Sequence, residues 1–363
     1  MASRSELNLT NKAQLRARLA IRFSSILEMP EEEAARLARI LESDPVFEKL
    51  FRPRDPAFKV ISRKRFPGTR FTSSFYDYNE ETVPESPGGP GMEEFLSSRK
   101  GLVDKIRAMG VGNFEKYFLY EDGTMTAEDI SREANLPAET VAEIRKAMDE
   151  VMMHPDFFQV RTRPPEASPE IRLNVTRLAE YVPNSGGGLD ISFFSPGMAR
   201  GLYGIDYDKL KKLKSNGSLD PKEKKSIQET IRFLEMLNAR KNLIYRILHL
   251  LPLWQKDFFE TGDWDRLVPL TQKSAAGSLG VTPAAICRAI QDRSVILPAR
   301  EETSISDLFP SRKDILKRKM GPVFRENPGK SDRVIQKIVE ESFRVRLSRR
   351  SINVYRSELK TTA

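Results

Sequence analysis

The chain has 363 residues, of which 39% are hydrophobic and 31% charged, with one cysteine and two histidines. This length predicts two or three domains, and the composition excludes an intrachain disulfide and metal sites rich in cysteine or histidine. No apolar stretch approaches the ~18 residues of a membrane span. The N-terminus also lacks the apolar segment of a secretory signal. We therefore expect a cytoplasmic, nucleoid-associated protein with no membrane partner, metal or cofactor.

The basic excess lies at one end of the chain. Lysine and arginine total 60 against 51 acidic residues, a net charge of +9. Residues 311–363 hold 15 of these bases and 6 of the acids, so this segment alone carries the whole excess. Such an asymmetry indicates an acidic partner for the C-terminal segment, most often nucleic acid.

The first half of the chain divides into a helical region and a linker. Residues 1–51 predict two helices, the second opened by Pro30 and three glutamates and stopped at Asp44-Pro45. The apolar positions of the two helices are Leu15, Leu19, Ile21, Phe23, Ile26, Ala34, Leu37, Ala38 and Leu41. Residues 52–100, rich in proline and glycine near Pro84, predict a flexible linker.

Residues 101–262 predict a second, mainly helical domain. Within it, residues 126–148 have helix-turn-helix spacing, with Asn135 at a left-handed turn position. Residues 124–150 carry seven acids and three bases, so phosphate would repel them and a protein partner is expected. Two strands are expected at 171–175 and 189–194, around a Gly186–Gly188 turn. Asp220-Pro221 starts a long helix, which Pro252 is expected to kink or end.

Residues 263–310 predict a helix-turn-helix domain of the DNA-binding type. Ala276 suits a close helix crossing, Gly280 the positive-φ turn, and Thr282-Pro283 the start of the second helix. An ordinary helical hairpin is the alternative. The second helix presents its candidate DNA contacts at Thr282, Ala285, Arg288 and Gln291. Cys287 is expected to be a small packing residue.

Residues 311–363 predict a basic C-terminal domain. Val334, Ile335, Ile338 and Val339 form one apolar helix face. Ser348 would cap a final helix, with Ile352 and Tyr355 pointing inward. Arginine at the start of such a helix can reach guanine O6 and N7 with both fork nitrogens. The alternative is a basic helix that only aids solubility or binds RNA without sequence preference.

The last helix also carries a family resemblance. Residues 348–356 read Ser-Arg-Arg-Ser-Ile-Asn-Val-Tyr-Arg, which resembles the Ala-Arg-Arg-Thr-Val-Ala-Lys-Tyr-Arg-Glu box of the sigma-54 (sigma-N) family of bacterial RNA polymerase sigma factors. The likeness continues in the same order along the chain. Residues 255–262 and 269–271 look like the segments around the family's helix-turn-helix, and residues 120–124 resemble part of its core-binding domain. Residues 41–48 resemble the end of its activator-responsive region.

The resemblance implies a role for individual residues. Arg349 and Arg350 would read the upstream GG promoter element, and Ser351 and Arg356 would lie beside the same groove or its phosphates. Asn353 and Tyr355 are further candidate DNA contacts of this helix. Arg288 would act at the downstream element. The partners implied are core RNA polymerase at residues 101–262, promoter double-stranded DNA, and an ATP-driven AAA+ activator acting through residues 1–51. Asn353, Val354 and Ser357 depart from the box, and the arginine-rich N-terminal helix departs from the family's glutamine-rich one.

The sequence thus predicts a mainly α, multidomain protein of helical bundles, with two DNA-binding helix-turn-helix units, a core-binding helical domain and a little β structure. We expect an initiation factor and no enzyme, because isolated carboxylates such as Asp122 and Asp190 form no catalytic set. A stand-alone DNA-binding regulator built on the same architecture is the alternative function.

Overall fold

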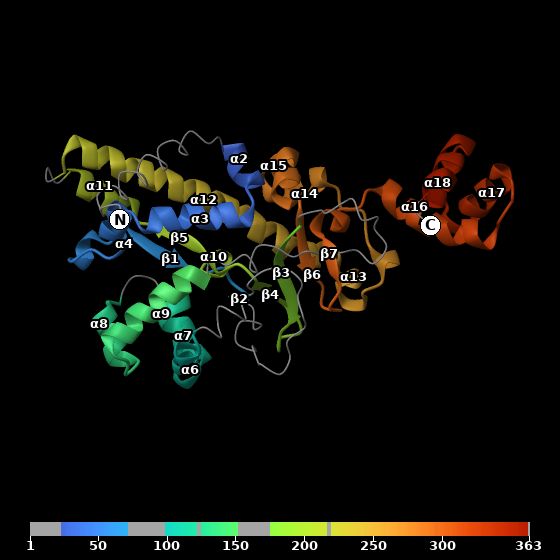
Figure 1. Cartoon of the computed structure of the whole chain (residues 1–363). Coiled ribbons are helices and arrows are strands. Elements are labelled where there is room, and N and C mark those ends of the chain that lie inside the picture. The colour runs from blue at the N-terminus through green and yellow to red at the C-terminus, as the bar shows by residue number, and fades with distance from the viewer. Residues whose placement is uncertain (1–22, 72–98, 122–124, 152–174, 216–218, 362–363) are drawn as a thin grey trace.

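The computed structural model describes residues 23–71, 99–121, 125–151, 175–215 and 219–361. The protein is mainly helical, with two small sheets, and its last three helices project from one end of an elongated body (Figure 1). No helix in these ranges is long and apolar enough to cross a membrane.

Three helices make up the described part of the N-terminal region: α2 (Phe23–Glu28), α3 (Glu31–Glu42) and α4 (Pro45–Phe51). As predicted, α3 starts after Pro30 and buries Ala34, Leu37 and Leu41. Asp44-Pro45 ends α3, but it also starts α4, because the Asp44 carboxylate accepts a hydrogen bond from the Val46 amide. The expected contacts of Leu15, Leu19 and Ile21 lie outside the described residues.

The first part of the expected linker is folded. A 3₁₀ turn, η1 (Pro56–Phe58), is followed by strands β1 (Ile61–Lys64) and β2 (Thr69–Phe71). Val60, Ile61, Phe66 and Phe71 are buried. The linker prediction is therefore wrong for residues 56–71, although Phe58 in the first turn stays exposed. Residues 72–98, with the Pro84 segment, lie outside the described residues.

Residues 100–151 form a small helical layer below the body in Figure 1. Its elements are α6 (Lys100–Met109), α7 (Val111–Phe114), a π-helical turn η3 (Glu115–Leu119), α8 (Ala127–Glu133) and α9 (Ala138–Val151). Asn135 takes the left-handed conformation expected for the turn between α8 and α9, with φ of 52°. Ile130, Val141 and Ile144 are buried between these helices.

The larger sheet has the order β2-β4-β3-β6-β7. The hairpin β3 (Thr176–Pro183) and β4 (Leu189–Phe193) is antiparallel, β2 and β6 (Arg293–Ile296) add in parallel, and β7 (Glu302–Ser304) closes the edge. The predicted second strand and glycine turn are confirmed. The predicted first strand, at 171–175, lies outside the described residues except for Val175, and β3 begins at Thr176. A second sheet pairs β1 with β5 (Leu202–Ile205).

Helix α12 (Pro221–Trp254) is the spine of the body, lying along its length in Figure 1. It starts as predicted, with a reciprocal cap between Asp220 and Glu223 and proline in the first turn. Pro252 does not end it; the helix continues to Trp254. Leu243, Ile244 and Leu248 pack in one core with the larger sheet, while Ile231 and Leu234 pack with α3 and α4. The N-terminal helices therefore share a core with α12.

The remaining elements connect the spine to the projecting end. They are α10 (Pro196–Ala199), α11 (Tyr207–Ser215), α13 (Lys256–Thr261), η5 (Trp264–Arg266), α14 (Gln272–Leu279), α15 (Pro283–Ile290), η6 (Ile305–Leu308), α16 (Arg312–Glu326), α17 (Asp332–Phe343) and α18 (Arg349–Thr361).

Candidate nucleic-acid interface

Helices α16, α17 and α18 form a unit with its own core. Its fully or nearly buried side chains are Met320, Val323, Ile335, Val339, Ile352 and Tyr355, which are separate from the two cores of the body. The predicted inward direction of Ile352 and Tyr355 is confirmed. The predicted face of α17 is only partly correct, because Val334 is exposed. This separate core lets the unit present its surface independently of the body.

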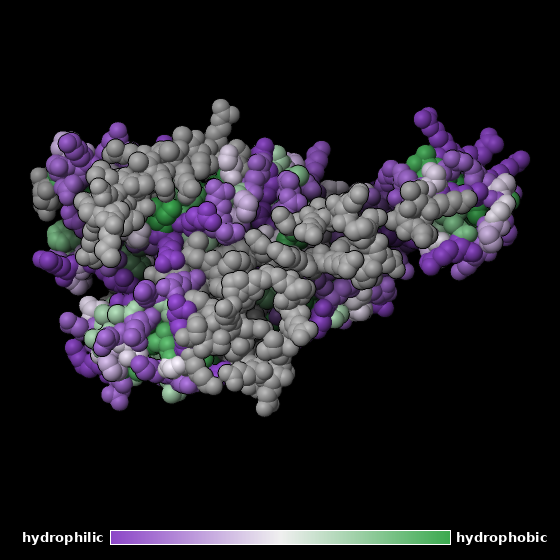
Figure 2. Space-filling view, viewed as in Figure 1, coloured by the Kyte–Doolittle hydropathy of each residue, from purple (hydrophilic) through white to green (hydrophobic). Residues whose placement is uncertain are grey.

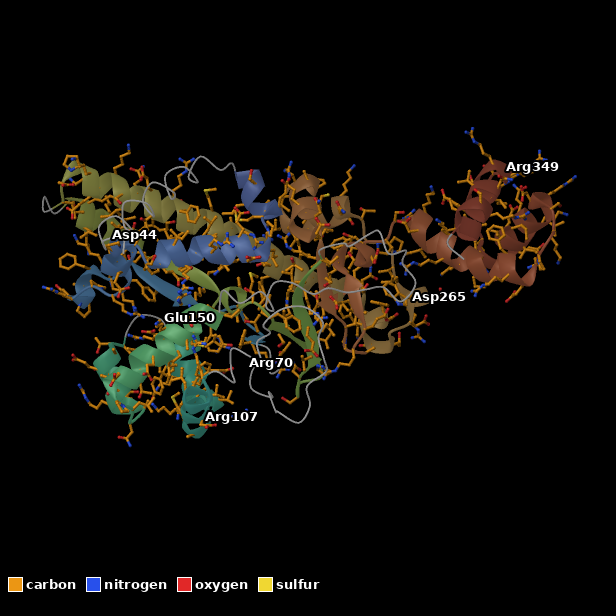
Figure 3. The ribbon with its side chains drawn as sticks, viewed as in Figure 1. Asp44, Arg70, Arg107, Glu150, Asp265 and Arg349 are labelled. Carbon is orange, nitrogen blue, oxygen red and sulfur yellow. The ribbon has the colours of Figure 1, made fainter. Side chains whose placement is uncertain are left out.

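The start of α18 is held by a local cap. The Ser348 hydroxyl accepts a hydrogen bond from the Ser351 amide at 3.0 Å, as the sequence predicts. Arg349 and Arg350 occupy the first turn and are exposed. Figure 3 places Arg349 on the projecting unit, and in Figure 2 this unit carries mainly hydrophilic side chains. The geometry leaves both guanidinium groups available to a ligand.

Several other cations of the unit are already paired. Lys317 lies 3.0 Å from Glu358, and its hydrogen bond holds the pKa of that exposed carboxylate below its usual value. Arg356 lies 3.0 Å from Asp332 and donates to the Lys330 carbonyl. By contrast, Arg349 and Arg350 make no ion pair with any described residue. Other cations of the unit, such as Lys319 and Lys337, also lack an ion pair with a described residue, so Arg349 and Arg350 are distinguished by being adjacent and exposed at the start of a helix.

The other predicted contacts on α18 differ in their surroundings. Asn353 is exposed, and its amide donates to Asp332 at 3.4 Å. Ser351 shares a hydrogen bond with Ser348, so its hydroxyl serves the cap. Tyr355 is 6% exposed and belongs to the core, which makes a supporting role fit better than a direct contact.

Helices α14 and α15 have the geometry expected of residues 272–290. Gly280 has φ of 64°, in the left-handed region that glycine adopts without steric cost. Thr282 caps α15 by accepting from the Ala285 amide at 3.2 Å, and Ala276, Leu279 and Ile286 are buried. Thr282 and Gln291 are exposed, whereas Ala285 is half-buried. Cys287 is exposed, so the expectation that it packs inside is wrong.

Arg288 forms an ion pair with Glu28, a residue near the other end of the chain. Its Nε lies 2.5 Å from Glu28 Oε1, at the end of α2. A second arginine also binds this end of α2: the Arg293 guanidinium donates hydrogen bonds to the carbonyls of Leu27 and Met29. No local sequence pattern indicates this role of Glu28, since 260 residues separate the two partners.

A buried charge network fixes this arrangement. Arg240 donates to the Ile26 and Met29 carbonyls and lies 2.5 Å from Glu31, which also faces Arg293 at 3.5 Å. Burial would raise the pKa of Glu31, but the two guanidinium charges outweigh it and lower that pKa.

Within the described ranges, no group of three potential metal ligands occurs.

Part of the chain matches a known protein family. Residues 222–363, from the first turn of α12 to the last residue, match the family model "Sigma-54, DNA binding domain". A protein of Clostridium kluyveri named as an RNA polymerase sigma-54 factor is 26% identical, over 38% of this chain and 32% of its own length. The matched region is thus similar to the DNA-binding domain of the sigma-54 family. The chain aligns with only about a third of this sigma-54 relative.

A solved structure, that of Aquifex aeolicus sigmaN bound to promoter DNA, is 16% identical. It covers 74% of this chain and 96% of its own, with a TM-score of 0.35. A score this low carries no information about individual positions. The sigma-54 match itself spans both α14–α15 and the Arg349-Arg350 helix, so both candidate interfaces lie inside the DNA-binding region of the family.

Proposed function

We propose that this protein is a sigma-54-type transcription initiation factor, which binds core RNA polymerase and directs it to promoter DNA. The observation that carries the proposal is the exposed, unpaired Arg349-Arg350 pair at the start of α18, on a self-contained basic unit inside the matched domain. Arginine forks suit guanine edges in the major groove, where each good bidentate contact discriminates by ~1–3 kcal/mol.

The other partners are assigned to the body. Helices α14 and α15 form a second helix-turn-helix contact to DNA, with Thr282, Ala285, Arg288 and Gln291 on its surface. The acidic layer α8–α9 and the rest of residues 101–262 bind core polymerase, because a net negative surface disfavours phosphate. An AAA+ ATPase activator would act on the N-terminal helices. Strand opening then needs no catalytic group from this chain.

A stand-alone DNA-binding regulator is the second candidate, and the separate core of α16–α18 favours it, because such a unit can bind DNA without a polymerase. One experiment separates the two. The full chain is mixed with core polymerase at moderate salt and captured, and its footprint on a bound duplex is mapped with and without polymerase. The sigma factor co-purifies and its footprint extends; no capture and an unchanged footprint would reject polymerase binding.

A further inference from the structure

A charged cavity lies between the N-terminal helices and the layer of α6–α9, away from both candidate DNA surfaces. Its volume is about 280 Å³. One wall comes from α3, α4 and β1, and the other from α9, Glu121 and the π-helical turn. The cavity is therefore closed only when the two layers are together.

Arginine dominates the lining. The charged residues around the cavity are Arg39, Arg52, Arg63, Arg145, Arg200, Glu42, Glu48 and Glu121, which leaves a net charge of +2. Guanidinium groups in such number around a cavity are typical of sites that bind phosphate or carboxylate.

The carboxylates do not satisfy all of these donors. A single oxygen of Glu121 takes both Arg52, at 2.7 Å, and Arg145, at 2.8 Å. The Nε atoms of Arg52 and Arg145 are buried and have no hydrogen-bond partner within the described residues. A buried donor without a partner costs about 1–3 kcal/mol. The carboxylates of the lining therefore satisfy these two guanidinium groups only in part.

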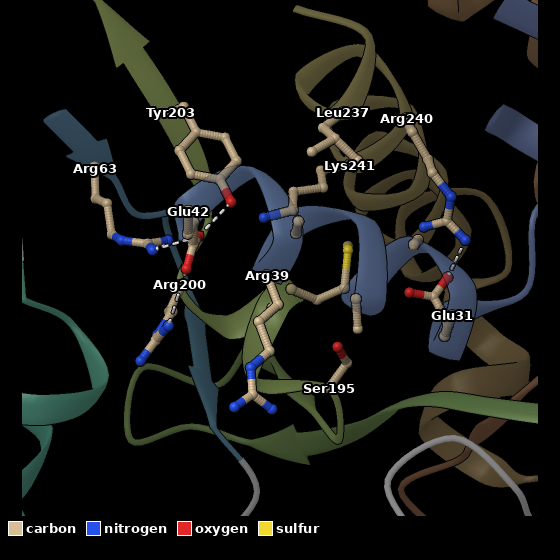
Figure 4. Close-up of a pocket in the computed structure, with 15 residues that line it drawn as sticks. Glu31, Arg39, Glu42, Arg63, Ser195, Arg200, Tyr203, Leu237, Arg240 and Lys241 are labelled. Atoms are coloured by element: carbon tan, nitrogen blue, oxygen red, sulfur yellow. Dashed lines mark hydrogen bonds and ion pairs between the residues drawn. The ribbon is translucent and has the colours of Figure 1, made fainter. Parts of the chain in front are cut away.

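Glu42, in the adjoining wall, is shared in the same way. Figure 4 shows its carboxylate between Arg63, Arg200 and Tyr203, with Arg39 and Lys241 lining the neighbouring pocket. Arg63 lies 2.6 Å and Arg200 3.8 Å from Glu42. Burial, followed by the charge of Arg63, lowers the pKa of Lys241 in the neighbouring pocket to about 7.

We propose that this cavity binds a phosphate-bearing small molecule, held by the guanidinium groups of Arg39, Arg52 and Arg145. The apolar part of the lining, Phe47, Phe51, Phe118 and Met148, would cover an uncharged portion of the ligand. The volume lies at the small end of ligand sites, so pyrophosphate or the phosphates of one nucleotide fit the space. Because both layers contribute arginines, the ligand would also tie α9 to the N-terminal helices.

The test titrates inorganic pyrophosphate into the full chain by calorimetry, at constant ionic strength, with sodium chloride as the blank. One site per chain is expected. Arg39→Gln should weaken binding at least about tenfold, as expected for the loss of a charge-assisted hydrogen bond. Arg36→Gln is the matched control, since Arg36 lies on the same helix but pairs with Glu32 on the surface; its affinity should stay that of the wild type.

Glu121→Gln should strengthen pyrophosphate binding, which a general loss of folding would not do. Removing this carboxylate frees Arg52 and Arg145, so pyrophosphate should bind several-fold more tightly. This variant decides the matter if Arg39→Gln fails to fold. Absence of binding, or equal affinity in the Arg39, Arg36 and Glu121 variants, would overturn the proposal. Binding that is lost instead with Arg349→Ala would place the anion on α18 and overturn it as well.

Discussion

The body and the projecting C-terminal unit differ in where their key arginines lie and in whether these are paired. In the body, arginines are buried and paired over long sequence distances, as Arg240 and Arg293 are with Glu31. In the unit, Arg349 and Arg350 are exposed and make no ion pair with a described residue. Burial with a partner fixes the architecture, whereas exposure without one leaves charge for a ligand. Arg288 lies between these cases, because it is on a candidate DNA surface but pairs with Glu28.

The largest expected effect is a loss of stability when the buried charge network is broken. Glu31→Gln leaves Arg240 and Arg293 without a carboxylate, which should lower the free energy of unfolding by about 3–5 kcal/mol. Glu32→Gln is the neighbouring control, because Glu32 forms an exposed pair with Arg36 worth at most about 1 kcal/mol. Urea unfolding measures both. Equal losses for the two variants would show that burial does not distinguish these charges.

The next effect concerns pH. The pKa of Lys241 is lowered to about 7 by burial and by Arg63, from a usual value of 10.5. Between these values the unfolded chain binds more protons, so the free energy of unfolding should rise with pH, by up to ~1.4 kcal/mol per pH unit. Lys241→Met should remove this rise. Urea titrations of both proteins from pH 7 to 9 test the prediction, and parallel curves would refute it.

Charge in the projecting unit should instead affect binding. Arg349→Ala and Arg350→Ala should each weaken DNA binding by ~1–3 kcal/mol while leaving folding unchanged. Lys319→Ala, on exposed α16, should weaken binding to all duplexes alike and reduce the slope of affinity against salt. Fluorescence anisotropy at several salt concentrations separates the two behaviours. If all three variants showed the same loss of affinity for every duplex and the same change in salt dependence, α18 would contact only the phosphates.

The smallest effect tests the intermediate case. Glu28→Gln frees Arg288 and should tighten DNA binding by no more than about fivefold, since an exposed ion pair is worth at most ~1 kcal/mol. Arg288→Ala should weaken binding and make the Glu28 substitution silent. A tightening that persists in the double variant would mean that Glu28 acts through general charge and not through Arg288.

Local chemistry was predictable from sequence, and long-range pairing was not. The caps at Asp220, Thr282 and Ser348 and the turn at Gly280 depend on residues within four positions, so they could be found by inspection. The contact between Glu28 and Arg288 crosses most of the chain and leaves no local pattern. The same reason hid β1 and β2, whose partners are distant strands. At Pro252 the local signal was off by only two residues, because α12 continues to Trp254 and ends there.

The central claim is that Arg349 and Arg350 read DNA sequence. The most direct measurement selects bound duplexes from a randomised pool with the wild-type chain and with the Arg349→Ala/Arg350→Ala variant, and sequences both. The account predicts a guanine-containing element enriched by the wild type and lost in the variant, with other preferences retained. Enrichment of the same element by both proteins, or of none by the wild type, would contradict it.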